Sequence, residues 1–156
     1  ARPTAVRLSL PSDRSRAEIE RTLARYGSTQ FMYGWETGRA VIGFAMNDRL
    51  VRFVLPMPDR SDRRFTQTPT GKPRAATAAE SAWEQACRQR WRALALVVKA
   101  KLEAVESGIT EFEDEFLAQI VLPDGSTAGG WLRPQIASAY ESGAMPTMLP
   151  ALGAGS

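Results

Sequence analysis

The stretch that decides the fold covers residues 29–55 and reads "TQFMYGWETGRAVIGFAMNDRLVRFVL". Within it lie three runs rich in apolar and aromatic residues: 29–35, 39–46 and 50–55. The intervening "ETG" and "NDR" suit short hairpin connections. Two prolines, Pro56 and Pro58, follow the third run, and neither can donate a hydrogen bond to a sheet. This pattern predicts an antiparallel meander of three strands that ends before residue 56.

Helical patterns lie on both sides of the meander. Residues 15–27 predict a short helix, because Ser15 and Glu18 have capping-box spacing and Gly27 is a natural stop. A long helix is expected from Thr77, again with capping-box spacing, to about residue 106, where Ser107 and Gly108 stop it. Its apolar residues recur at three- and four-residue steps: Trp83, Cys87, Trp91, Leu94, Val98, Leu102 and Val105.

The predicted fold class is α+β: a three-stranded antiparallel meander preceded by a short helix and covered by a long helix, with additional C-terminal helices. Those additional helices are expected at 110–122, where Thr110 and Glu113 repeat the capping spacing, and at 131–143. We expect a single domain, 1–156, with three irregular segments. They are a flexible lead-in at 1–14, a long basic loop at 56–76 and a tail at 143–156.

Composition excludes several classes of protein. At 156 residues with 44% hydrophobic and 24% charged residues, the chain has a globular composition, and no apolar run reaches the ~20 residues of a membrane span. A single cysteine, Cys87, fits a reducing compartment and forms no internal disulfide. We therefore expect a protein of the bacterial cytoplasm, without a membrane partner.

The residue types also argue against common chemistries. Histidine is absent, which excludes Ser-His-Asp and Cys-His catalysis. Neither a dinucleotide-binding nor a phosphate-binding glycine loop is present. Four carboxylates in "EFEDE", 111–115, have two interpretations, a metal site or a favourable charge at a helix N-terminus, of which the second is preferred. The sequence predicts neither an enzyme nor a cofactor nor a metal site.

Charge is distributed unevenly. Residues 1–74 hold 14 Lys/Arg against 7 Asp/Glu, whereas residues 109–156 hold 1 against 6. A basic front half indicates an anionic partner, but it is equally compatible with attraction between the two ends of the chain or between identical subunits.

Three rings on alternate residues raise a question that sequence leaves open. Phe31, Tyr33 and Trp35 share one face of the first strand. The commoner arrangement places such rings in the core. The other places them on the surface as a platform for nucleic-acid bases, with arginines around them. The candidate nucleic-acid-binding residues are Phe31, Tyr33, Trp35, Arg39, Arg49, Arg52, Arg60, Arg63, Arg64, Lys72, Arg74, Arg88 and Arg92.

Two segments carry a resemblance to known sequences: "YGSTQFMYG", residues 26–34, and "WEQACRQRWRALALVVKAKLEAVESGITEFEDEFLAQIVLPDG", residues 83–125. They resemble small proteins of bacteriophage and prophage genomes over about residues 18–147. The resemblance implies a phage setting and assigns no functional residue.

The sequence therefore predicts a non-catalytic nucleic-acid-binding accessory protein of phage DNA replication or recombination, which favours single-stranded DNA. The alternative is an oligomeric assembly, adaptor or inhibitor protein that acts through protein–protein contacts. A homo-oligomer is expected in either case.

Overall fold

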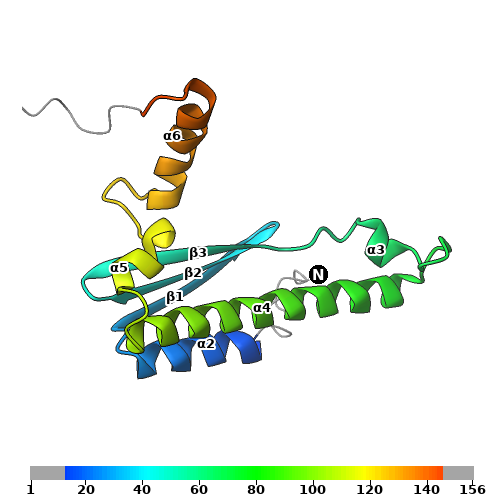
Figure 1. Ribbon diagram of the computed structural model, residues 1–156. Helices are drawn as coiled ribbons and strands as arrows, with labels where there is room; N and C mark the ends of the chain where they lie inside the picture. The colour runs from blue at the N-terminus through cyan, green and yellow to red at the C-terminus, as the bar shows by residue number, and fades with distance from the viewer. Residues whose placement is uncertain (1–12, 146–156) are drawn as a thin grey trace, which may run out of the picture.

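The computed structural model describes residues 13–145 and confirms the α+β class (Figure 1). The elements, in chain order, are α2 (Asp13–Arg25), β1 (Gln30–Glu36), β2 (Arg39–Met46), β3 (Arg49–Pro56), α3 (Arg63–Thr66), α4 (Ala76–Glu106), α5 (Phe112–Glu115), the 3₁₀ helix η2 (Leu117–Gln119) and α6 (Ala128–Ser142). The predicted lead-in before residue 13 and the tail after residue 145 lie outside the described residues, whereas Asp13 and Arg14 belong to α2.

The three strands form the predicted antiparallel meander, in the order β1-β2-β3. Their bounds match the predicted ones within about one residue. Asn47 and Asp48 connect β2 to β3 with φ angles of 51° and 58°. Positive φ at both central residues is the signature of a type I′ turn, whose twist matches that of the flanking strands.

The main core lies between one face of the sheet and the helices α2 and α4 (Figure 1). Alternate residues of β2 and β3 point into it: Ala40, Ile42, Phe44, Met46, Val51 and Phe53. Phe116 closes one end, where its ring stands edge-on to Phe44 at 5.7 Å and to Phe53 at 6.2 Å. The predicted apolar stripe of the long helix is confirmed as the surface that the sheet covers from Trp91 onward.

Helix α4 is longer than the sheet that covers it. Its 31 residues span about 46 Å, whereas the eight residues of β2 span about 26 Å. The projecting N-terminal part is covered instead by the segment between β3 and α4, in which α3 places Phe65 against Trp83 and Cys87. Residues 57–75 therefore pack as an ordered part of the fold through this second, smaller core.

The predicted helix at 110–122 is wrong. Only α5 and η2 are helical there, and Ile120 forms an antiparallel bridge with Val51, next to a hydrogen bond from the Val121 amide to the Leu50 carbonyl (2.8 Å). The outer edge of β3 has unpaired backbone groups, and pairing them stabilises the extended conformation over another helical turn.

The three helix starts predicted from capping-box spacing are also wrong, although each of the three regions contains a helix. Ser15 lies inside α2, and α4 begins at Ala76 after an N-cap residue, Ala75, that has no side-chain cap. Helix α5 begins two residues after Thr110. The predicted stops are confirmed, since Gly27 and Gly108 follow their helices with positive φ.

Helix α6 covers all but the last residue of the predicted 131–143 segment and starts earlier, at Ala128. It rises from the side of the sheet opposite to α4 (Figure 1). Between residues 13 and 145, none of the helices has the combination of length and apolar character that crossing a bilayer requires.

Candidate functional site: an aromatic cavity beside a basic arm

A cavity of about 470 Å³ opens where the β1–β2 hairpin meets α4 and the first residues after β3. Its size falls in the range of about 300–1,000 Å³ that is typical of small-ligand sites. It is lined by Tyr33, Trp35, Glu36, Thr37, Gly38, Arg39, Ala40, Met57, Pro58, Asp59, Arg60, Trp83, Cys87 and Trp91. The mismatch in length between α4 and the sheet creates this space, because the hairpin ends before the helix does.

Aromatic rings form much of the wall, and each is held differently. Tyr33 packs against Trp91 with ring centroids 5.6 Å apart, and burial raises the pKa of its hydroxyl, so the ring stays neutral. Trp83 donates its indole N–H to the Pro58 carbonyl at 2.7 Å. Trp35 is 47% exposed, which leaves its ring free to contact a bound molecule.

Charged groups of both signs stand at the mouth. Arg39 forms an ion pair with Glu36 across the hairpin turn. Arg60 forms an ion pair with Glu80, and its guanidinium lies 3.9 Å from the centroid of the Trp83 ring, which is a cation–π arrangement. The cavity lining therefore includes two arginines that are held by ion pairs, and the guanidinium of one of them, Arg60, lies over an aromatic ring.

Asp59, also at the mouth, accepts hydrogen bonds from the backbone N–H of Ser61 at 2.9 Å and from its hydroxyl at 2.8 Å. These bonds lower the pKa of the Asp59 carboxyl, so this group is ionised at neutral pH.

The Cys87 thiol lines the cavity and is buried, as its position on the apolar stripe predicted. Burial raises its pKa to about 11. A thiol with that pKa is protonated at neutral pH and is a poor nucleophile.

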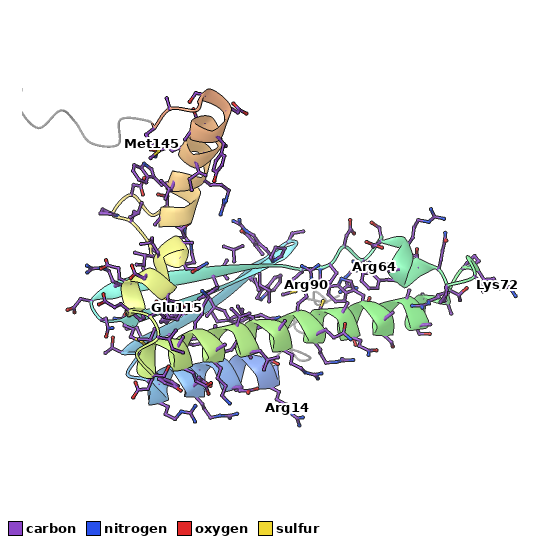
Figure 2. All side chains as sticks on the ribbon, in the orientation of Figure 1. Arg14, Arg64, Lys72, Arg90, Glu115 and Met145 are labelled. Atoms are coloured by element: carbon purple, nitrogen blue, oxygen red, sulfur yellow. The ribbon has the colours of Figure 1, made fainter. Side chains whose placement is uncertain are left out.

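The cavity lies at the root of a projecting segment that we call the basic arm, residues 57–90. It comprises the segment after β3, α3 and the N-terminal part of α4, and it holds 7 Lys/Arg against 4 Asp/Glu. Figure 2 places Arg90, Arg64 and Lys72 along it, with Lys72 at the tip. Arg90 donates to the Pro56 carbonyl at 2.9 Å, and Arg64 pairs with Asp62 at 3.2 Å.

Several cations of the arm stay exposed. Arg63, Lys72 and Arg88 form no ion pair with any residue that the structure describes. Arg74 is half-buried just before α4 begins, and Arg92 is exposed just beyond the arm. The excess positive charge is therefore accessible to an anionic partner.

The three rings of the first strand do not form an open platform. Phe31 and Tyr33 are half-buried against the main core, so for these two rings the core arrangement, the commoner of the two expected, is correct. Trp35 alone of the three is exposed. The reason is that Phe31 and Tyr33 pack against the main core, whereas Trp35, near the end of β1, lines the cavity.

Two predicted arginines lie away from both the cavity and the arm. Arg49 pairs with Glu113 at 3.2 Å, at the opposite end of the sheet. Arg52 lies on the outer face of the sheet and donates to the Gly125 carbonyl at 2.8 Å. The predicted set thus divides into the cavity residues Tyr33, Trp35, Arg39 and Arg60, the remaining residues of the arm, and these two. Phe31 belongs to the main core, and Arg92 lies just beyond the arm.

The sequence did not single out Trp83, Trp91, Met57 and Arg90 as site residues. Trp83, Cys87 and Trp91 were assigned to the core because they share the apolar stripe of the long helix. The lengths of the predicted elements contained a signal for this site. Strands of seven or eight residues are too short to cover the whole apolar stripe of the long helix, so part of the stripe has to line another surface.

The carboxylates of 111–115 are divided between different partners. Glu113 contacts Arg49, and Glu115 accepts from Lys101 at 3.3 Å. Within residues 13–145 there is no cluster of three or more Asp, Glu or Cys side chains arranged to hold a metal ion.

Comparisons with protein-family models, with curated proteins and with solved structures found nothing that matches this chain.

Proposed function

We propose that the protein is a non-catalytic nucleic-acid-binding protein that favours single-stranded DNA. The observation that carries the proposal is the position of an aromatic-lined cavity at the root of an arm with excess positive charge. In this proposal the cavity receives an unpaired base, and the cations of the arm contact the phosphates on either side.

The shape of the site supports single strands over duplexes. A base inside a duplex is already stacked and paired, whereas an unpaired base can turn into a concave site and stack on an aromatic side chain. Trp35, exposed at the mouth, is the ring best placed to meet such a base. Stacking on one aromatic ring contributes about 1–3 kcal/mol per base.

The ion pairs at the mouth do not oppose phosphate binding. In the Arg39–Glu36 and Arg60–Glu80 pairs every side chain is at least 39% exposed. Exposed pairs of this kind are worth about 0–1 kcal/mol, so a phosphate can replace the carboxylate at small cost. Arg63, Lys72 and Arg88 need no such exchange.

A role as an accessory in phage DNA replication or recombination belongs to the same proposal. Its support is the resemblance of residues 26–34 and 83–125 to small phage proteins, together with the basic arm.

The test is fluorescence anisotropy of a labelled single-stranded oligonucleotide and of its duplex, titrated with protein at two salt concentrations. We expect tighter binding of the single strand and a steep fall of affinity with salt, because phosphate contacts release counterions. Trp35→Ala should weaken binding with little change in the salt slope. Arg63→Glu should weaken binding and also reduce the slope, by about 1 for each phosphate that the protein no longer neutralises.

Arg133→Glu is the matched control. It makes the same change of charge at an exposed arginine of α6, away from the arm. If Arg133→Glu and Arg63→Glu weaken binding equally, only the net charge matters and the arm is not the site. Absence of salt-sensitive binding to the single strand would reject the proposal.

A further inference from the structure

Helix α6 has no buried residue along its 15 residues, and Pro134 lies inside it. An isolated helix of about 15 residues is marginal in water, and an interior proline costs about 3 kcal/mol more. The described chain supplies little packing to offset this. A surface outside this copy of the fold is therefore needed to stabilise the helix.

The root of α6 is nevertheless firmly placed. Gly129 lies so close to η2 that an added Cβ would be 2.9 Å from the Ala118 carbonyl oxygen. The Thr127 hydroxyl caps the helix by accepting from the Gly130 N–H at 3.1 Å. These contacts fix the direction in which the helix leaves the body, and Met145 marks its far end in Figure 2.

The helix carries an apolar stripe that becomes more exposed with distance from this root. Leu132, Ile136 and Tyr140 recur at four-residue steps and so share one face. Leu132 is half-buried, Ile136 is 47% exposed and Tyr140 is 87% exposed. Charged residues are scarce, since α6 contains only Arg133 and Glu141.

The outer face of the sheet, opposite to α4, carries a second set of exposed apolar side chains, which lie around Arg52. Met32, Leu50 and Val54 are exposed there, by 50%, 37% and 46%. Gly34 and Gly43 lie on this same face, and a Cβ added to Gly34 would meet nothing within 4 Å. Glycines lower the surface between the larger side chains, which permits close approach of another element.

We propose that two copies of this chain form a symmetric dimer in which α6 of each copy packs across the outer sheet face of the other. The dimensions agree, because α6 is about 22 Å long and the strands of eight residues are about 26 Å long. A helix about 10 Å wide covers about 220 Å² of projected surface, and a two-fold exchange uses four such surfaces. The resulting total is about 900 Å² of projected area, which does not yet include the extra area that protruding side chains add. The smaller stable interfaces bury about 1,200 Å² in total.

A second copy fits these surfaces better than an unrelated partner, because one chain presents both halves of the contact. The helix and the open face lie on the same side of the sheet (Figure 1). A dimer with two-fold symmetry can therefore bury both apolar surfaces of each copy in one closed assembly. This inference does not depend on the proposed binding of nucleic acid.

The test is the mass of the full chain in solution, measured by sedimentation at micromolar concentration. We expect twice the chain mass of 17.1 kDa. Ile136→Asp on α6 and Val54→Lys on the sheet should each give monomers, with a dissociation constant raised about 100-fold or more, because an unpaired charge is then buried at two symmetric places. The control is Leu96→Asp on α4, which replaces a 63% exposed apolar residue outside the contact and should leave the dimer intact.

Mixing the two monomeric variants separates this geometry from pairing of α6 with α6. In a mixed pair, one helix–sheet contact is unaltered, and the other brings the two introduced side chains, which have opposite charges, against each other. A heterodimer should therefore form. A wild-type monomer would overturn the proposal. So would a Val54→Lys variant that remains dimeric, or a mixture that remains monomeric while circular dichroism finds both variants folded.

Discussion

Replacing Phe65 with alanine should release residues 57–75 of the basic arm from α4 and leave the sheet core folded. Phe65 is 5% exposed and is the apolar side chain by which α3 reaches Trp83 and Cys87. The buried residues of this small cluster are distinct from those of the main core under the sheet, and Met57 packs against both. Truncating a buried phenylalanine costs about 3–5 kcal/mol, which the few remaining contacts of the arm do not offset.

This free-energy cost predicts how much the reactivity of Cys87 should change. At about 1.4 kcal/mol per factor of ten, a destabilisation of about 3 kcal/mol raises the population of the opened arm about 150-fold. Cys87, the single cysteine, is buried against Phe65 in this cluster and reports the release of residues 57–75 without interference. The rate at which an aromatic disulfide reagent modifies the native protein should rise by about the same factor. The thermal midpoint of the sheet core should change little.

Arg63→Ala is the control, since it alters an exposed side chain of the same short helix. It should leave the reactivity of Cys87 unchanged. An unchanged rate in a folded Phe65→Ala variant would show that Phe65 does not hold the arm. Unfolding of the sheet core in step with the arm would refute the separation into two clusters.

Three further predictions concern the thiol, the core and a turn. Burial raises the Cys87 pKa to about 11, so the rate of alkylation of the native protein should stay slow through about pH 9 and increase toward pH 11. The rate in urea should instead follow the ordinary thiol pKa of about 8.5. Comparable rates for the native and the urea-unfolded protein at about pH 8 would contradict this. Phe116→Ala should lower the free energy of unfolding in urea by about 3–5 kcal/mol, because the ring is fully buried against Phe44 and Phe53; a decrease below about 1 kcal/mol would place Phe116 outside the core. Gly38→Ala should cost about 1 kcal/mol in the same assay through strain alone, since Gly38 has a φ of 84° and an added Cβ meets nothing within 4 Å; a neutral result would mean that the turn adopts another conformation.

Local signals predicted the elements of the fold well where one face of each element is buried. The apolar run at 39–46, bounded by turn residues, and the sustained stripe from Trp83 to Leu102 indicate a strand and a helix, because each pattern fits an element that buries its apolar residues. The glycines that end α2 and α4 were also predicted correctly, since a positive φ has few alternatives.

Prediction failed where long-range contacts decide the conformation. Residues 110–122 have a helical pattern, yet Ile120 is extended because it pairs with Val51, which lies far earlier in the chain. Helix starts were misplaced for a similar reason. The capping signature is a short local pattern, and packing of the apolar stripe decides which residue begins the helix.

The sequence by itself determined the α+β class, the meander, the long helix and the concentration of positive charge before residue 75, because periodicity and composition are local properties. Tertiary structure alone decided that Phe31 and Tyr33 face the core while Trp35 reaches a cavity, and that Phe65 fastens the arm beside it. It also decided that α6 and the outer sheet face are left uncovered. The physical reason is that the face which a strand or helix buries depends on the element packed against it, and that contact joins residues far apart in the chain.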